Sequence, residues 1–257
     1  MREKLLLDEF TWPEIYHKIS NSDVAYFPVG TQEGHGPHLP MGTDMYVATG
    51  TGILASQKTG GIVLHPLSYC FSGATNAFRG TVSIPMHLEM EVIKAVVRNL
   101  WQQKFRAIFV LNIHAPNDIP IMMALRELFE YERIVVSYFN PYTFINEKKY
   151  GYDDVAKEAA MCYASMEVLG LGELIPDLTS LKDEDGSPLS LPGQEKLRTG
   201  YHFTHILQHM PVRKVEVAKG RKMLKEAADE LVSQVDSLRE YSKFIEKGGN
   251  PPFSVRP

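Results

Sequence analysis

The sequence predicts an α/β protein: a three-layer α/β/α sandwich around a mainly parallel central sheet. Short apolar runs, such as residues 24–29 and 107–112, alternate along the chain with longer amphipathic stretches such as residues 88–103. Strands and helices that alternate at this spacing favour right-handed βαβ units, with helices on both faces of a parallel sheet. The length of 257 residues suits one large domain covering residues 1–257.

The expected elements follow in a regular order. Pro13 stands in the first turn of an opening helix, a position that proline favours. Residues 107–112 (AIFVLN) form the clearest buried strand, because the run is short, apolar and rich in strand formers. The full set comprises helices at 8–19, 45–57, 88–103, 119–131 and 214–239, and strands at 24–29, 62–67, 107–112 and 134–138.

Two segments are expected to lie outside these elements. Residues 182–198 are rich in Pro, Gly, Ser and charge, which predicts a long exposed loop, and residues 248–257 are expected to form an irregular tail. His202, His205 and His209 share one face if this stretch is helical. Because no acidic residue accompanies them, a packing or interface face is favoured over a metal site; entry of one histidine into a partner subunit's active site is the alternative.

Composition excludes several classes of function. A net charge of −4 and a pI near 6.1 give no electrostatic case for nucleic acid as a partner. No stretch of eighteen uninterrupted apolar residues exists to span a membrane, and no signal peptide is expected. Cys70 and Cys162 lie in mixed apolar contexts and are predicted to be buried free thiols of a cytoplasmic protein.

The most informative stretch is residues 31–44, TQEGHGPHLPMGTD, directly after the first predicted strand. Glu33 and His35 are two positions apart, so in extended backbone their side chains share a face. Asp44 must fold back to join them, and the intervening glycines and prolines supply turns. Carboxylate with imidazole suits Zn, Mn or Fe, and a carboxylate can bridge two ions. The alternative is a polar loop whose histidines cap backbone groups, and His38 is equally compatible with a structural role.

Further polar residues follow other predicted strands. His114 comes directly after residues 107–112, and ligands of open α/β sheets sit beyond the carboxyl ends of strands. The His114 loop and the Glu33–Asp44 loop are therefore expected to converge at one rim. Asp118 either reaches a second metal or, more in keeping with its position, caps the following helix. A loop of small polar residues is predicted to bind substrate through Ser72, Thr75 and Asn76, unless these side chains merely satisfy turn backbone.

Residues 28–44 resemble the hallmark segment of the creatininase (creatinine amidohydrolase) family, PVGxxExHGxHLPxxTD, almost throughout. Residues 78–83, 110–114 and 218–220 resemble three weaker family segments in the expected order. The chain is identified as a divergent member. The resemblance implies a creatininase-like α/β/α sandwich, one or two divalent ions per chain (Zn, Mn or Fe), and a homo-oligomer, commonly a hexamer.

The resemblance also implies which residues hold metal. Glu33, Asp44 and His114 would hold one ion, and His35 and Asp44 the other, with Asp44 bridging. In creatininases a glutamate two positions after His114 completes the second site, whereas this chain has Pro116 there. With two ligands left, weaker occupancy of the second site is expected.

A second departure concerns catalysis. The family's HAGExETS segment corresponds to residues 158–165 when counted back from Glu173, which places Glu158 at the catalytic histidine. Glu158 is therefore predicted to be the acid/base, unless the reaction differs. The expected activity is attack of metal-bound hydroxide on the carbonyl of a small polar substrate, a cyclic amide or formamide. The alternatives are hydrolysis of a diketo-inositol (3-dehydro-scyllo-inosose type), with cleavage of a carbon–carbon bond, or a non-catalytic metal-binding relative.

Overall fold

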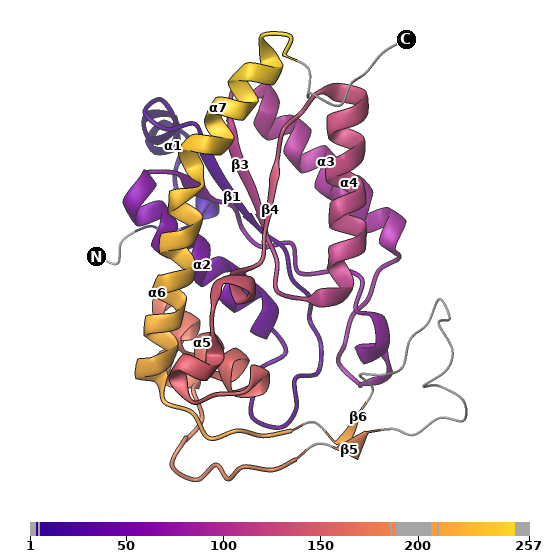
Figure 1. The fold of residues 1–257 in the computed structure, drawn as a ribbon, viewed down its shortest axis with the longest axis vertical. Helices are drawn as coiled ribbons and strands as arrows, with labels where there is room; N and C mark the ends of the chain where they lie inside the picture. The colour runs from indigo at the N-terminus through magenta and orange to yellow at the C-terminus, as the bar shows by residue number, and fades with distance from the viewer. Residues whose placement is uncertain (1–3, 5, 186, 189–206, 210, 250–257) are drawn as a thin grey trace.

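The computed structural model describes residues 4, 6–185, 187–188, 207–209 and 211–249. Its centre is a four-stranded sheet with the order β2-β1-β3-β4, in which every neighbouring pair is parallel (Figure 1). The strands are β1 (Val24–Pro28), β2 (Ile62–Val63), β3 (Ala107–Leu111) and β4 (Ser137–Phe139), with a separate antiparallel pair, β5 (Ser187–Pro188) and β6 (Leu207–His209). The α-helices are α1 (Trp12–Ile19), α2 (Thr43–Thr59), α3 (Met86–Gln102), α4 (Asp118–Glu132), α5 (Asp154–Val168), α6 (Val217–Ser233) and α7 (Val235–Glu246).

Alternate strand residues face opposite helix layers, as the period of two requires. In β1, Ala25 and Phe27 belong to the core that includes residues of α3 and α4. Tyr26 belongs to a second core, which includes residues of α2, α6 and α7. Every residue of β1 and β3 is buried, because helices cover both faces. The predicted three-layer sandwich is confirmed.

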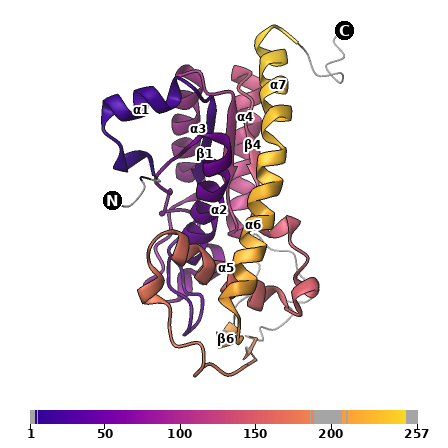
Figure 2. The same ribbon diagram turned by 90° about the vertical axis from the view of Figure 1, so that its left-hand side faces the viewer.

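Helix α5 packs mainly against α2 and α6. Figure 2 shows α7 continuing almost in line with α6 along the molecule. Where α5 and α6 meet, a Cβ on Gly220 would lie 1.9 Å from the carbonyl oxygen of Ala160. Glycine therefore lets the two backbones approach, and this contact holds α5 beside the start of α2.

The strand order fixes where a ligand can bind. From β1 the chain crosses to β2 on one side, and from β2 it crosses back to β3 on the other side of β1. The loops that leave β1 and β3 therefore depart in opposite directions from neighbouring strand ends, where Pro28 pairs with Leu111. Such a reversal point, at the carboxyl ends of parallel strands, is the usual ligand crevice of an open α/β sheet.

Two helix predictions need correction. The opening helix at 8–19 is interrupted, since a short turn at Leu7–Glu9 precedes α1, and Thr11 caps α1 in a capping box with Glu14. The single helix predicted over 214–239 is wrong, because the chain forms two helices that meet at Gln234. There the Gln234 N–H bonds to the Leu231 carbonyl, three residues back, which tightens the turn and ends α6.

Two strands are shorter or displaced. The run 62–67 pairs as a strand only at Ile62–Val63, with one further bridge between Leu67 and Val29. The strand predicted at 134–138 begins only at Ser137. The strand begins later than predicted for a local reason. Arg133 adopts a left-handed conformation (φ 58°), and the Ile134 N–H donates to the Leu128 carbonyl, which ends α4.

The predictions for 182–198 and 248–257 fall largely outside the described residues. His202 and His205 lie there too, whereas His209 belongs to strand β6, so the condition of a helix is not met at that position. Among the residues that the structure describes, no helix has the length and apolar character that a bilayer crossing requires.

Candidate metal centre

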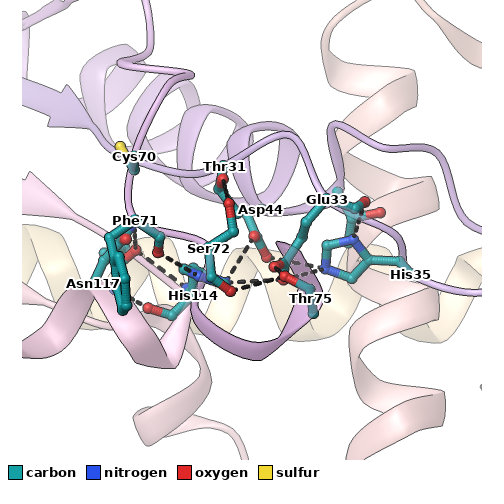
Figure 3. Close-up of polar contacts among 12 residues, drawn as sticks. Thr31, Glu33, His35, Asp44, Cys70, Phe71, Ser72, Thr75, His114 and Asn117 are labelled. Carbon is teal, nitrogen blue, oxygen red and sulfur yellow. Dashed lines mark hydrogen bonds and ion pairs between the residues drawn. The ribbon is translucent and has the colours of Figure 1, made fainter. Parts of the chain in front are cut away.

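The loops after β1 and β3 bring four predicted ligands together at the carboxyl edge of the sheet (Figure 3). Glu33 and His35 stand on the loop after β1, and Asp44 is the second residue of α2, so the turns between them fold the chain back as expected. His114 follows β3 directly. All four side chains are buried, with no residue more than 7% exposed.

The first group consists of Glu33, Asp44 and His114. One ligand atom from each lies within 4.8 Å of the others. His114 Nδ1 lies 2.9 Å from Glu33 Oε1 and 3.3 Å from Asp44 Oδ2. Two carboxylates and one imidazole at this spacing form a ligand set for a borderline divalent cation.

The second group consists of His35, Asp44 and Glu158, again with ligand atoms within 4.8 Å of one another. His35 Nε2 lies 3.2 Å from Asp44 Oδ1, the oxygen that does not face His114. Asp44 therefore belongs to both groups, one oxygen toward each. Glu158 comes from the first turns of α5 and completes this group, which the sequence alone left with two ligands.

Backbone carbonyls orient both imidazoles. The other ring nitrogen of His114, Nε2, lies 3.1 Å from the Phe71 carbonyl oxygen. His35 Nδ1 lies 3.1 Å from the Glu33 carbonyl oxygen. A ring N–H that donates to a carbonyl leaves the opposite nitrogen as the lone-pair donor. The structure thus presents Nδ1 of His114 and Nε2 of His35 to the carboxylates.

The loop predicted to bind substrate through Ser72, Thr75 and Asn76 does not place all three side chains in one site. The Thr75 hydroxyl donates to Oε2 of Glu33. Ser72 is fully buried, and its hydroxyl lies 3.3 Å from that of Thr31. Asn76 is exposed and does not line the cavity described below. Two of these hydroxyls therefore support the metal loop, and a role in substrate binding stays a prediction.

Two further candidates stand outside both ligand groups. His38 is buried, and neither ring nitrogen has a hydrogen-bond partner among the described residues; burial lowers its pKa. Asp118 makes no capping bond at α4. Instead it accepts hydrogen bonds from Asn112 Nδ2, at 3.1 Å, and from the Tyr138 hydroxyl. The expected cap at Asp118 is wrong, because its side chain braces the loop that carries His114.

The electrostatics of the cluster are those of a cation site. Burial opposes a charge on His35 and His114, but the facing carboxylates outweigh it and raise the pKa of each to about 10. Burial, with Asp44 and Glu33 nearby, raises the pKa of Glu158 to about 7. Burial also disfavours the Asp44 carboxylate, yet the two histidines hold its pKa well below the ordinary value. The buried carboxylates therefore need positive charge nearby to remain ionised.

Divalent ions fit this donor set. Asp44 Oδ2 is buried, and it faces His114 Nδ1 at 3.3 Å without the geometry of a hydrogen bond. Buried carboxylate oxygens normally have a partner, and a metal ion provides one. Three carboxylates and two neutral imidazoles balance the charge of two divalent ions to within one unit, which supports a two-ion site at Glu33, His35, Asp44, His114 and Glu158.

The centre opens into a cavity of about 610 Å³. Its lining includes the apolar side chains of Phe71, Met86 and Ile119, and also Tyr142 and Lys157. Sequence reasoning missed Tyr142 and Lys157. The available signal was positional: Tyr142 follows β4, whose carboxyl end reaches the same rim, and Lys157 precedes Glu158 on α5.

A family model described as creatinine amidohydrolase matches residues 8–169, which is more than half of the chain. The chain belongs to the creatininase family. All four metal ligands predicted from the hallmark and the His114 loop, together with Glu158, lie within the matched range. The family resemblance expected from the sequence is confirmed.

Named relatives within the family differ in activity. Creatinine amidohydrolase from Pseudomonas putida is 28% identical over 155 residues, which cover 54% of this chain and 60% of that protein. 3-Dehydro-scyllo-inosose hydrolase from Thermotoga maritima is 28% identical over 141 residues, covering 54% of this chain and 45% of that protein. The matched region thus spans about half the length of these relatives.

A solved manganese creatininase shares the fold over almost the whole chain. Its TM-score is 0.69 at 22% identity, covering 93% of this chain and 98% of that one. At this identity the likeness concerns the fold alone. Together with the family match, it shows that the creatininase fold extends beyond residue 169.

Proposed function

We propose that this protein is a metal-dependent hydrolase that acts on the carbonyl of a small polar molecule, a cyclic amide or a formamide. The observation that carries the proposal is the placement of Asp44, whose two oxygens face different histidines in two adjoining ligand groups. A shared carboxylate is how a protein holds two ions close enough to act on one substrate. The names of the family relatives, all hydrolases, support the reaction class.

In this proposal Glu33, Asp44 and His114 hold one divalent ion, and His35, Asp44 and Glu158 hold the second. Zn, Mn and Fe all suit these ligands. Bound there, the ions would acidify a shared water and polarise the substrate carbonyl. The residues of the chain keep the ligands oriented: Phe71 and Glu33 do so through their carbonyls and Thr75 through its hydroxyl.

Glu158 changes role relative to the sequence-based prediction, which made it the acid/base. We propose that it is the third ligand of the second ion. Pro116, at the position where the resemblance implies a glutamate ligand, lines the cavity but has no side-chain donor. Glu158 supplies a carboxylate to the same group from α5. With three ligands, the second site is expected to fill more tightly than the sequence suggested.

A second candidate reaction is hydrolysis of a diketo-inositol. It is favoured by one observation: the inosose hydrolase relative is as similar to this chain as the creatinine amidohydrolase relative, at 28% identity. From the family resemblance we also propose a cytoplasmic homo-oligomer, with a hexamer as the expected size, which light scattering after gel filtration would measure.

The proposal is tested by metal content per chain, measured by elemental analysis of protein purified without chelator. We expect about two equivalents in the wild type, none in Asp44→Ala, and about one in Glu158→Gln. Asp154→Asn is the matched control, since Asp154 lines the cavity one turn before Glu158 but belongs to neither ligand group; it should keep two equivalents.

Loaded protein is then screened against creatinine, simple lactams, formamides and inososes. Wild-type protein that takes up no metal after add-back would overturn the hydrolase proposal and leave a relative without metal chemistry. Two equivalents with no turnover of any of these compounds would favour the non-catalytic metal-binding relative.

A further inference from the structure

The hydroxyl of Tyr142 is buried in the wall of the cavity beside the metal centre. It has no hydrogen-bond partner within the described structure, although it lies near the carboxylates of Glu158 and Asp44. Buried hydroxyls without a partner are rare, because a hydroxyl that loses its water without a replacement is destabilising. Nothing in the metal-ligand assignment uses this group.

We propose that Tyr142 donates a hydrogen bond to the substrate's carbonyl oxygen as negative charge develops on it. This inference rests on the proposed function, since it deepens the account of the same site. It identifies a polar contact that the cavity offers in addition to the ions, in a lining that also includes the apolar side chains of Phe71 and Met86.

The ring of Tyr142 is held in place from two sides. Tyr142 is the second residue of the short turn after β4, Pro141–Phe144, and its backbone N–H donates to Oδ1 of Asn140 at 2.9 Å. The ammonium of Lys157 lies 5.3 Å from the ring centroid, in cation–π range. A pre-set hydroxyl loses little entropy when it binds, as an oxyanion contact requires.

Glu158 is a neighbouring acceptor that competes for the hydroxyl proton, although no hydrogen bond between the two side chains has good geometry. The carboxylate oxygens near it belong to Glu158 and Asp44, which the proposed ions engage. The Lys157 ammonium can only donate, and it is itself bonded to Asp154 Oδ1 at 2.8 Å. A bound carbonyl oxygen between the ions and Tyr142 would satisfy the hydroxyl, and a neutral O–H stabilises developing negative charge without adding a full charge to the site.

The test uses Co²⁺-loaded protein titrated with acetohydroxamate, a small carbonyl-containing chelator, and follows the visible Co²⁺ spectrum. Tyr142→Phe removes only the hydroxyl. We expect it to weaken acetohydroxamate binding by about tenfold, the order expected for one lost hydrogen bond to a charged group. The Co²⁺ spectrum before titration should match the wild type. Tyr150→Phe is the control, because the Tyr150 hydroxyl bonds to Glu226 outside this cavity, and it should bind like the wild type.

The outcomes separate this inference from the proposed function. Unchanged acetohydroxamate affinity in Tyr142→Phe would overturn the inference while leaving the metal-dependent hydrolase intact. A Co²⁺ spectrum altered before any probe is added would also overturn it, since Tyr142 would then be a positioning residue for Glu158. Wild-type protein that binds no Co²⁺ would overturn the proposed function, and this inference with it.

Discussion

Thr75 and His114 contact different carboxylate oxygens of Glu33. The Thr75 hydroxyl donates to Glu33 Oε2, while Glu33 Oε1 lies 2.9 Å from Nδ1 of His114. The carboxylate is therefore fixed in rotation before any ion binds, with Oε1 aimed at the first ligand group. Partners that orient a metal ligand in this way commonly contribute 10–100-fold to metal affinity.

Thr75→Val should therefore weaken the first ion. Valine has nearly the shape of threonine but cannot donate a hydrogen bond. The Glu33 carboxylate therefore gains rotational freedom, which is lost again when the metal ion binds. We expect a 10–100-fold rise in the dissociation constant of the tighter ion, measured by competition with a chromophoric chelator. Thr75→Ser keeps the hydroxyl and should stay near the wild type. Equal losses in both variants would show that packing of the methyl group, rather than the hydrogen bond, matters.

Glu89 should make stability depend on pH. It is fully buried on α3, and burial raises its pKa to about 7, although a hydrogen bond from the Phe71 N–H opposes this. The ordinary value is 4.5, so the folded protein binds the proton more tightly than the unfolded chain does. The contribution of Glu89 to the free energy of unfolding is thus largest below about pH 4.5, and it falls as the pH rises toward 7. At ~1.4 kcal/mol per pH unit the loss is ~3 kcal/mol.

Urea unfolding between pH 4.5 and 8 measures this effect. Glu89→Gln keeps an acceptor for Phe71 but cannot ionise, so its stability should fall less than that of the wild type over this range. Glu91→Gln is the control, because Glu91 is exposed on the same helix and pairs with Lys94. If the Glu89→Gln and wild-type curves stay parallel, then Glu89 does not titrate in this window.

Gly220 should be intolerant of any side chain. Because its Cβ would lie 1.9 Å from the Ala160 carbonyl oxygen, Gly220→Ala must push α6 away from α5. We expect a loss of about 3 kcal/mol in the free energy of unfolding, the upper end of the usual cost of overpacking, with weaker binding of the second ion because α5 carries Glu158. At Gly172 a Cβ would meet only the Glu167 side chain, at 3.8 Å, so Gly172→Ala should be close to neutral.

Much of the site could be predicted from local sequence. Glu33, His35 and Asp44 stand within one short loop, and His114 follows the clearest buried strand. Apolar runs identify the strands because burial on both faces demands them, and parallel strands end at the same edge. The fold class and the convergence of these four residues follow from that reasoning. The break between α6 and α7 at Gln234 could not be predicted in this way, because a tightened helical turn barely changes the spacing of apolar residues along the sequence.

Glu158 and Tyr142 show what only the tertiary structure decided. Both are separated from the hallmark loop by about a hundred residues or more. Tyr142 stands in no pattern that marks a donor. The family resemblance placed Glu158 in the site, but as an acid/base rather than as a metal ligand. Glu158 reaches Asp44 because α5 packs against both α2 and α6, an arrangement that includes the close approach of α5 and α6 at Gly220. Local sequence determines strand ends and loop chemistry, since those depend on neighbouring residues. Which distant helix completes the centre depends on how whole helices pack, and that is a property of the folded chain.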